Sequence, residues 1–216
     1  MRSTDIRTLA ALTVMLFAGL TTPLCAADDA ESVAAFVGRI NSAGYKNRSS
    51  CSGFQLQGGH VVTAAHCIPP LKQDAVYFVR GYRQGTYTEL QTTRSGDFAL
   101  AAADDLAVLC GADPLTPGLT VAATPPSAEH AFSVFGYGSP RVHSLTVSSC
   151  RFLGWNNASQ FYLDCPLPPG TSGGAVVIQL ENEWQIVGVV SASSKTLSRA
   201  VWINPQTIRG FCPSSD

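Results

Sequence analysis

The stretch from Pro168 to Val176, PPGTSGGAV, contains the residue best suited to nucleophilic chemistry. Ser172 has a glycine two positions before it and two glycines directly after it, so the backbone can turn sharply there and leave the hydroxyl uncovered. A serine hydroxyl is a weak nucleophile unless a base takes its proton, and that base is most often a histidine. The string alone is ambiguous, because it fits the nucleophile turns of different hydrolase classes as well as a glycine-rich turn between two strands.

The positions of the four histidines separate these alternatives. They are His60, His66, His130 and His143, and none follows Ser172. The serine–acid–histidine order of the α/β-hydrolases is therefore excluded. The subtilisin order requires an aspartate before the histidine, and the only aspartates before His66 lie close to the N-terminus. The order histidine, aspartate, serine remains.

Two further motifs support this order. TAAHC, residues 63–67, contains His66, and DLAVL, residues 105–109, begins with an aspartate directly before an apolar run. His66, Asp105 and Ser172 follow one another at intervals of 39 and 67 residues. Together with GTSGG around the serine, these motifs resemble those of the trypsin-like, chymotrypsin-fold serine peptidases. The resemblance covers essentially the whole mature chain, and the short loops are most similar to those of the compact secreted bacterial-type members.

The resemblance implies a role for each of these residues in a serine endopeptidase. His66 would be the general base, Asp105 would orient its imidazole, and Ser172 would attack the substrate carbonyl to form an acyl-enzyme. The backbone N–H groups of Gly170 and Ser172 would form the oxyanion hole. Asp104 is expected to be an ordinary loop residue, because only Asp105 directly precedes the apolar run. No metal and no organic cofactor are implied.

The same resemblance places the substrate-binding residues. Ser191 matches the serine that hydrogen-bonds the catalytic aspartate. Ala192 and Ser193 match the segment that pairs with an extended substrate backbone. The implied partner is a protein or peptide substrate.

The residue preference follows from the position six residues before Ser172. There trypsin has the acid that selects Lys and Arg, whereas this chain has Pro166. Because a buried cation without a counter-charge is costly, we expect no preference for Lys or Arg at the scissile bond. A small or apolar residue is the first expectation. An acidic residue, attracted by Lys195 and Arg199, is the alternative.

The residue before Ser172 predicts how the site is activated. It is Thr171, where the animal enzymes place an aspartate that pairs with a newly cut N-terminus. We therefore expect that removal of a signal peptide alone yields a competent site. Pro168 and Pro169 restrict the backbone of the loop, and the Thr171 hydroxyl can hydrogen-bond locally.

Two other functions fit the same residues. One is a catalytically silent binding protein on the same fold. The other is a serine esterase, because ester and peptide hydrolysis share the same acyl chemistry. Labelling by a fluorophosphonate distinguishes an active site from a silent one, and comparison of peptide with ester substrates distinguishes the two enzymes.

The first 27 residues are typical of a secretory signal peptide. Arg2 and Arg7 precede a twelve-residue apolar run, Leu9 to Leu20, which is too short to span a bilayer. Cleavage is expected after Ala27, which leaves residues 28–216 as one peptidase domain, secreted to the extracellular space or the periplasm and without a membrane anchor.

A lipoprotein anchored at Cys25 is the alternative to this secreted chain, and the bulky Leu24 before it disfavours that alternative. With two arginines and one aspartate lost in the signal segment, the mature chain has 12 basic and 14 acidic side chains, a net charge of −2. It contains no basic run of five or more residues, so we expect no nucleic-acid partner. We expect a monomer.

Six cysteines remain in the mature chain, an even number that indicates disulfides in an exported protein. No CxxC or HxxxH spacing indicates a zinc site. The resemblance implies Cys51–Cys67, which would fix the loop that contains His66. Proximity to Ser172 favours Cys150–Cys165, and Cys110–Cys212 follows by elimination.

Short strand-like runs between turn residues predict an all-β chain. Six runs precede a stretch rich in Pro, Gly and Thr at about 113–127, and six follow it. We therefore predict two antiparallel six-stranded β-barrels, at about 33–112 and 128–216, with that linker between them and the active site in their cleft. The expected strands are 33–40, 54–57, 61–64, 75–82, 87–92, 106–110, 131–136, 145–150, 160–164, 175–180, 184–191 and 200–203. A short helix is predicted for Pro205–Phe211, with proline at its start.

Overall fold

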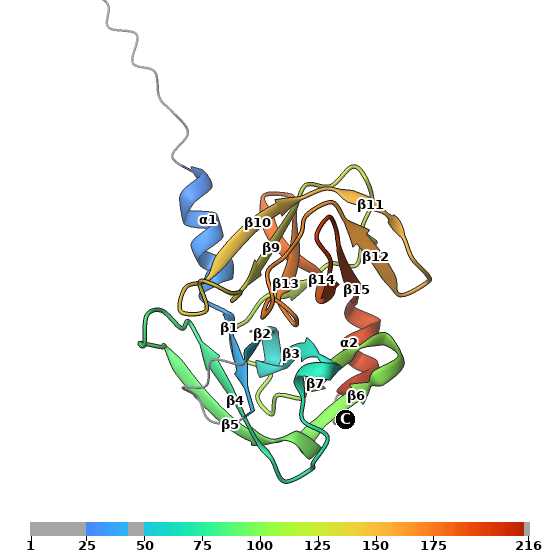
Figure 1. The fold of residues 1–216 in the computed structure, drawn as a ribbon. Helices are drawn as coiled ribbons and strands as arrows, with labels where there is room; N and C mark the ends of the chain where they lie inside the picture. Colours follow the sequence, from blue (N-terminus) through green and yellow to red (C-terminus); the bar gives the residue numbers. More distant parts are fainter. Residues whose placement is uncertain (1–24, 43–49, 214–216) are drawn as a thin grey trace, which may run out of the picture.

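The computed structural model describes residues 25–42 and 50–213, and most of the secondary structure within them is β-strand. The strands form two curled, mainly antiparallel sheets that pack against each other, one from each half of the chain (Figure 1). Most of the predicted signal peptide, residues 1–24, lies outside the described residues.

The first sheet has seven strands in the order β5-β4-β1-β2-β3-β7-β6. Strands β3 and β7 are buried along their whole length, as their apolar sequences VVTA and LAVL require. The bounds are β1 Val37–Asn41, β2 Ser50–Gln55, β3 Val61–Ala64, β4 Ala75–Arg80, β5 Glu89–Arg94, β6 Phe98–Ala101 and β7 Leu106–Leu109.

The second sheet has the order β10-β9-β13-β14-β15-β12-β11, and the short strand β8 pairs with β14 in parallel. The central strand β14 is the longest, with 11 residues. The bounds are β8 Thr120–Val121, β9 Phe132–Gly136, β10 Thr146–Cys150, β11 Phe152–Trp155, β12 Gln160–Leu163, β13 Ala175–Leu180, β14 Glu183–Ser193 and β15 Ser198–Trp202.

The two sheets thus confirm the predicted all-β fold, but the number of strands was wrong. The sequence runs missed β6 and β11, which have four residues each, and the two-residue β8 inside the expected linker. The predicted first strand, 33–40, was also wrong at its beginning. Its first two residues end a helix, α1 (Cys25–Ala34), because this alanine-rich segment favours a helix that packs Ala30 and Val33 against the core.

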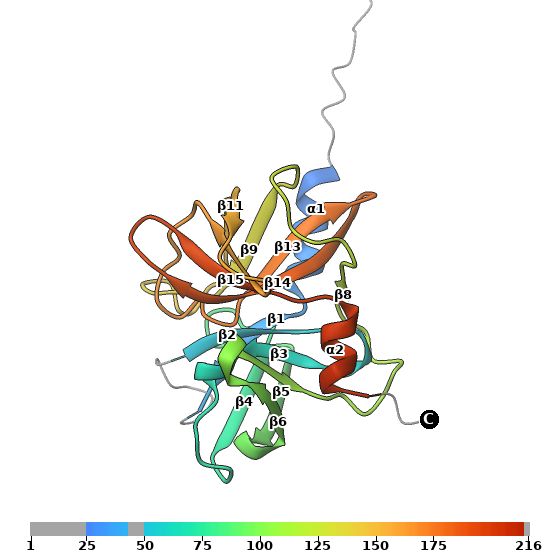
Figure 2. The ribbon, with the colours of Figure 1, turned by 90° about the vertical axis from the view of Figure 1, so that its right-hand side faces the viewer.

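The predicted C-terminal helix is confirmed as α2, Pro205–Phe211. Asn204 caps it by accepting a hydrogen bond from the backbone N–H of Thr207 at 2.8 Å. The two helices lie against opposite halves: α1 contacts the second sheet, and α2 lies beside the first (Figure 2). Within the described residues no helix is long and apolar enough to cross a membrane.

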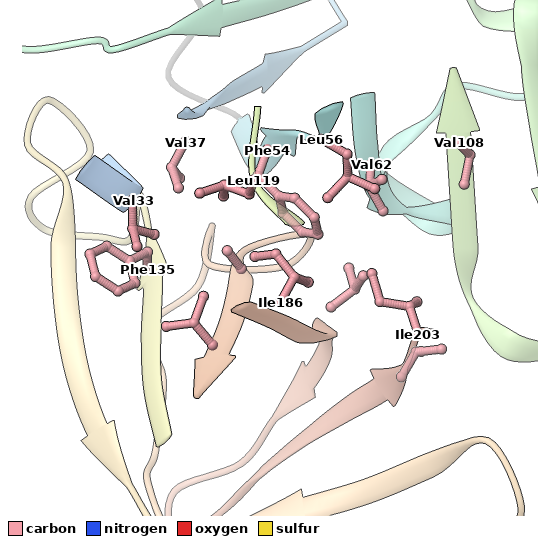
Figure 3. Packing of buried hydrophobic residues seen from close by; sticks show 14 of the residues in the cluster. Val33, Val37, Phe54, Leu56, Val62, Val108, Leu119, Phe135, Ile186 and Ile203 are labelled. Atoms are coloured by element: carbon pink, nitrogen blue, oxygen red, sulfur yellow. The ribbon is translucent and has the colours of Figure 1, made fainter. Parts of the chain in front are cut away.

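A buried apolar cluster joins the two halves. Phe54 of the first sheet and Phe135 and Ile186 of the second are each at most 1% exposed and belong to one cluster. Figure 3 shows Val33 of α1 beside Phe135, with Phe54 and Leu119 between the sheets. Burial of each such side chain contributes about 1.5–3 kcal/mol, so this cluster holds the halves in one relative position.

Three disulfides reinforce this arrangement, and they are the three expected pairs. Cys51–Cys67 and Cys150–Cys165 close short loops, with sequence separations of 16 and 15 residues. Cys110–Cys212 spans 102 residues and joins the end of β7 to the end of α2.

We expect removal of the long-range disulfide, in Cys110→Ala/Cys212→Ala, to reduce the free energy of unfolding by up to about 4–5 kcal/mol, because it closes the longest loop. The matched control is Cys150→Ala/Cys165→Ala, for which the same chain-entropy argument gives about 3 kcal/mol. Denaturant unfolding of both variants measures the difference. A loss in the first variant no larger than in the control would contradict the expectation.

Candidate active site

His66 lies in a short 3-10 turn, Ala65–Cys67, that directly follows the buried strand β3. All four residues of the strand are buried, whereas the His66 side chain in the turn is 48% exposed. The Cys51–Cys67 disulfide fixes the residue next to it. The local sequence therefore presents a solvent-accessible histidine on a rigid support.

Asp105 lies beside His66 because strands β3 and β7 are paired. Ala64 is opposite Leu106 in this pair, which brings the residues that follow β3 next to those that precede β7. Asp105 adopts a left-handed backbone conformation with φ 57°, which aspartate tolerates better than most residues. Its backbone carbonyl accepts a hydrogen bond from the N–H of Ala65 at 3.1 Å. The turn of His66 is therefore held at its beginning by this bond and at its end by the disulfide of Cys67.

The Asp105 carboxylate accepts hydrogen bonds from three donors. The His66 imidazole Nδ1 lies 2.9 Å from both carboxylate oxygens, and the His66 backbone N–H donates at 3.0 Å. The Ser191 hydroxyl donates to the other side at 2.7 Å. Burial alone would raise the pKa of Asp105, but the bonds from His66 and Ser191 outweigh it, so the pKa lies below its ordinary value. The group is an anion at neutral pH.

The same contact acts on the histidine. The hydrogen bond to Asp105 raises the pKa of His66, partial burial opposes it, and the charge of Asp105 adds to the increase. Nδ1 is committed to the carboxylate, so Nε2 is the nitrogen that faces away from Asp105 and can exchange a proton. The neighbouring Asp104 is instead bonded to the Ser159 hydroxyl at 2.7 Å, in agreement with its expected role as a loop residue.

Ser172 comes from the other half of the chain and lies against the ends of β2 and β3. The backbone N–H of Ser52 donates to the Ser172 carbonyl at 2.7 Å. Gly173 has φ 80°, and a Cβ there would be 2.1 Å from the Ser52 carbonyl and 2.2 Å from the Thr63 hydroxyl. Only glycine permits this approach, and Thr63 and Ala64 directly precede the turn that contains His66.

The polar groups of this loop are not all engaged. Within the described residues the Ser172 hydroxyl has no hydrogen-bond partner, neither His66 nor any other group. The backbone N–H groups of Gly170 and Ser172 also donate to no acceptor in the described part of the chain. Two backbone donors, one on either side of Thr171 in the sequence, and a hydroxyl are thus available to a ligand.

Thr171 fills a buried position between these two donors. It is 2% exposed, and its hydroxyl donates to the Pro168 carbonyl at 2.8 Å, which is the local bond expected from the sequence. Gly138 lies close to it: a Cβ there would be 2.4 Å from Pro168 and 2.8 Å from the Thr171 hydroxyl. The site around Thr171 is therefore filled by neutral groups.

A cavity of about 420 Å³ opens beside Ser172. Its lining is mainly apolar, contains no acidic residue among those described, and consists of Leu167, Pro168, Pro169, Thr171, Ser172, Val190, Ala192, Ser193, Ser194 and Lys195. Of the expected substrate-binding residues, Ala192 and Ser193 line it. Pro166 is exposed and does not, and Leu167 stands in its place because the Ser193 hydroxyl accepts its backbone N–H at 2.8 Å.

The two basic residues expected near the substrate, Lys195 and Arg199, lie in different places. Lys195 lines the cavity, whereas Arg199 donates to the Ser191 hydroxyl at 3.5 Å and lies outside the lining. Ser191 thus belongs with Asp105 and not with the cavity. Among the described residues that line the cavity, only Lys195 carries a positive charge.

One group of residues has the donor atoms for a metal. The ligand atoms of Cys51, His66 and Cys67 lie within 4.8 Å of one another. Metals bind cysteine as the thiolate, and both sulfurs are joined in a disulfide, so the group offers only one imidazole. It does not fit a metal ion.

The chain resembles known proteins in one family and in its fold. Residues 51–189 match the family model of the trypsin-like peptidase domain, a range that includes His66, Asp105 and Ser172. No curated protein matches the chain. Among solved structures, the thermostable serine protease AL20 from an extremophilic microorganism has a TM-score of 0.65 at 14% identity, covering 82% of this chain and 95% of that chain.

Two further solved structures give the same result. The active form of a protease from M. tuberculosis has a TM-score of 0.63 at 16% identity, covering 99% of this chain and 96% of its own. The protease Anisep from Arthrobacter nicotinovorans has a TM-score of 0.62 at 17% identity, with 82% and 93% covered. At these identities the likeness shows a shared fold.

We expect the His66 imidazole to titrate above pH 6.5, the ordinary pKa of histidine, because Asp105 stabilises its cation. The neutral ring then predominates above this raised pKa, and its fraction decreases as the pH falls through it. Asp105→Asn removes the charge and should lower the midpoint. Ring-proton NMR against pH measures it, with His60, whose pKa burial lowers, as the internal reference. A His66 midpoint that does not move in the variant would contradict the expected coupling.

Proposed function

Because the chain belongs to the trypsin-like peptidase family and is a serine-type endopeptidase, we propose that Ser172, His66 and Asp105 carry out its reaction and that it acts after export. The observation that carries this proposal is the Asp105 carboxylate, which bonds His66 Nδ1 on one side and the Ser191 hydroxyl on the other. This leaves His66 Nε2 free for the proton of a nucleophile, and Ser172 is presented from the opposite half.

The proposed reaction has two acyl-transfer steps. His66 Nε2 takes the proton of the Ser172 hydroxyl as its oxygen attacks the substrate carbonyl, and then gives that proton to the leaving amine as the peptide bond breaks. Water, deprotonated by the same nitrogen, attacks the resulting ester and releases the acid and Ser172. Asp105 stays ionised throughout and stabilises the imidazolium in both steps.

The developing oxyanion would be bound by the N–H groups of Gly170 and Ser172. Both are free of acceptors within the described residues, so each can donate to the oxyanion without first breaking another hydrogen bond. A donor that is already oriented is worth about 3–4 kcal/mol of transition-state stabilisation in comparable sites.

Export and activation are part of the same proposal. Three disulfides are expected in an oxidising compartment outside the cytosol. Thr171 carries no charge, its hydroxyl bonds the Pro168 carbonyl, and no acidic residue among those described lines the cavity beside it. Signal removal without a second cut is therefore the activation that fits this site.

We expect Ser172→Ala to abolish nearly all peptide hydrolysis, because the nucleophile is lost, and His66→Ala to cause a similar loss. The double variant should lose no more than either single variant, because the residues act as one unit. Hydrolysis of a peptide library by the folded variants measures this. Substantial remaining activity in Ser172→Ala would refute the mechanism.

Fluorophosphonate labelling of the wild-type chain is the companion measurement. Modification at Ser172 that depends on His66 supports an active site, whereas a wild-type chain that is not labelled is a silent relative. Hydrolysis of esters but not of peptides by the labelled protein would show an esterase instead.

We expect peptides with Ala or Leu on the acyl side of the scissile bond to be cleaved in preference to those with Arg, because the cavity is mainly apolar and Lys195 repels a cation. Lys195→Glu should raise the ratio of kcat/KM for Arg over Leu about fivefold, or ~1 kcal/mol for one exposed charge contact. Lys195→Met is the control for lost charge alone. Efficient wild-type cleavage after Arg would contradict this preference.

A further inference from the structure

The loop between Pro168 and Gly174 has a carbonyl anchor at nearly every residue. The Pro168 and Thr171 carbonyls are bonded inside the loop, by Thr171 and Gly174. Four others are bonded from outside it. Ser139 N–H donates to the Pro169 carbonyl at 2.8 Å, and the Ser52 hydroxyl donates to the Gly170 carbonyl at 3.0 Å. The Ser172 and Gly174 carbonyls accept the backbone N–H groups of Ser52 and Val190.

These outside anchors decide where the free donors point. In a trans peptide the C=O and N–H groups point in opposite directions, so the bond from Ser139 to the Pro169 carbonyl turns the Gly170 N–H away from Ser139. Gly170 has φ 101°, and as a glycine it can rotate its flanking peptides at little cost. The loop therefore needs contacts from elsewhere to stay in one conformation.

Ser52 on strand β2 supplies such a contact through all of its polar groups. Its side chain is fully buried, its backbone N–H donates to the Ser172 carbonyl at 2.7 Å, and its carbonyl accepts the Thr63 hydroxyl at 2.7 Å. The Tyr137 backbone N–H donates to the Ser52 hydroxyl oxygen at 2.8 Å. Because Tyr137 can only donate there, the single hydroxyl proton of Ser52 is committed to the Gly170 carbonyl.

We infer that Ser52 is a positioning residue for the reaction: its hydroxyl fixes the Gly170–Thr171 peptide, which lies between the two peptides that carry the Gly170 and Ser172 N–H groups, and thereby keeps these two donors directed toward the substrate. The inference rests on the proposed function. It assigns to a neutral hydroxyl from the opposite sheet the task of holding the oxyanion-hole loop. Without that hydroxyl, the Tyr137 N–H and the Gly170 carbonyl are both left unpaired in a buried site, which favours rotation of the Gly170 peptide to another partner.

The test compares Ser52→Ala with the wild-type enzyme. We expect kcat to fall by about tenfold or more, but by less than the roughly 10²–10³-fold loss that is typical when an oxyanion donor is removed outright. KM should stay within about threefold of wild type. The affinity for a peptide aldehyde, whose adduct with Ser172 carries the oxyanion, should fall by the same factor as kcat/KM. The His66 titration should not move, because Ser52 does not contact the imidazole.

The matched control is Thr86→Val. Thr86 also donates a hydroxyl to a backbone carbonyl, that of Arg83, at 2.7 Å, but among the described residues it makes no hydrogen bond to the loop. This variant should keep wild-type kcat and aldehyde affinity. Ser52→Cys keeps a weaker donor and should fall between wild type and Ser52→Ala. If the alanine variant does not fold, the cysteine variant decides by the same measurements.

A folded Ser52 variant with wild-type kcat, or one in which only KM changes, overturns the inference, and so does an equal loss in Thr86→Val. Failure of the proposed function would look different. If that function is wrong, the wild-type chain itself shows neither fluorophosphonate labelling nor peptide hydrolysis that Ser172→Ala removes.

Discussion

The contact between the loop of Ser172 and the ends of strands β2 and β3 is the constraint on which the site depends. Gly173 approaches the Ser52 carbonyl so closely that no side chain fits, and the Ser172 carbonyl is bonded by the Ser52 backbone. The shared apolar core holds the two halves together, and this contact fixes where the Ser172 loop lies relative to strands β2 and β3. Ser172 and His66 come from different halves of the chain, so neither half could assemble the arrangement alone.

Around this contact the site uses one ionised group and otherwise neutral hydrogen bonds. The Asp105 carboxylate is stabilised by three donors, which offsets the cost of its partial burial. The loop beside it is held by hydroxyl and amide groups, through Ser52, Ser139 and Thr171. Such bonds avoid the desolvation cost of a buried ion pair, and hydroxyl and amide groups do not titrate near neutral pH.

Much of this could be predicted from the sequence, because three short motifs in a fixed order imply both the fold and the candidate triad. The three disulfide pairs and helix α2 were confirmed. Other features depend on tertiary contacts that leave no local pattern. Strand β6 is too short to show a period, and Leu167 lines the cavity through its bond to Ser193. Nothing in the sequence around Ser52 indicates its role, which depends on four hydrogen-bond partners from distant segments.

The crossed placement of the two helices has a consequence for the order of assembly. The first sheet is braced by α2 and the Cys110–Cys212 disulfide, which come late in the chain, while α1, made early, packs on the sheet that is made second. A ribosome makes the chain from its N-terminus, so Ser172 is added after His66 and Asp105. The site therefore cannot be complete before the second half has been made and has packed on the first.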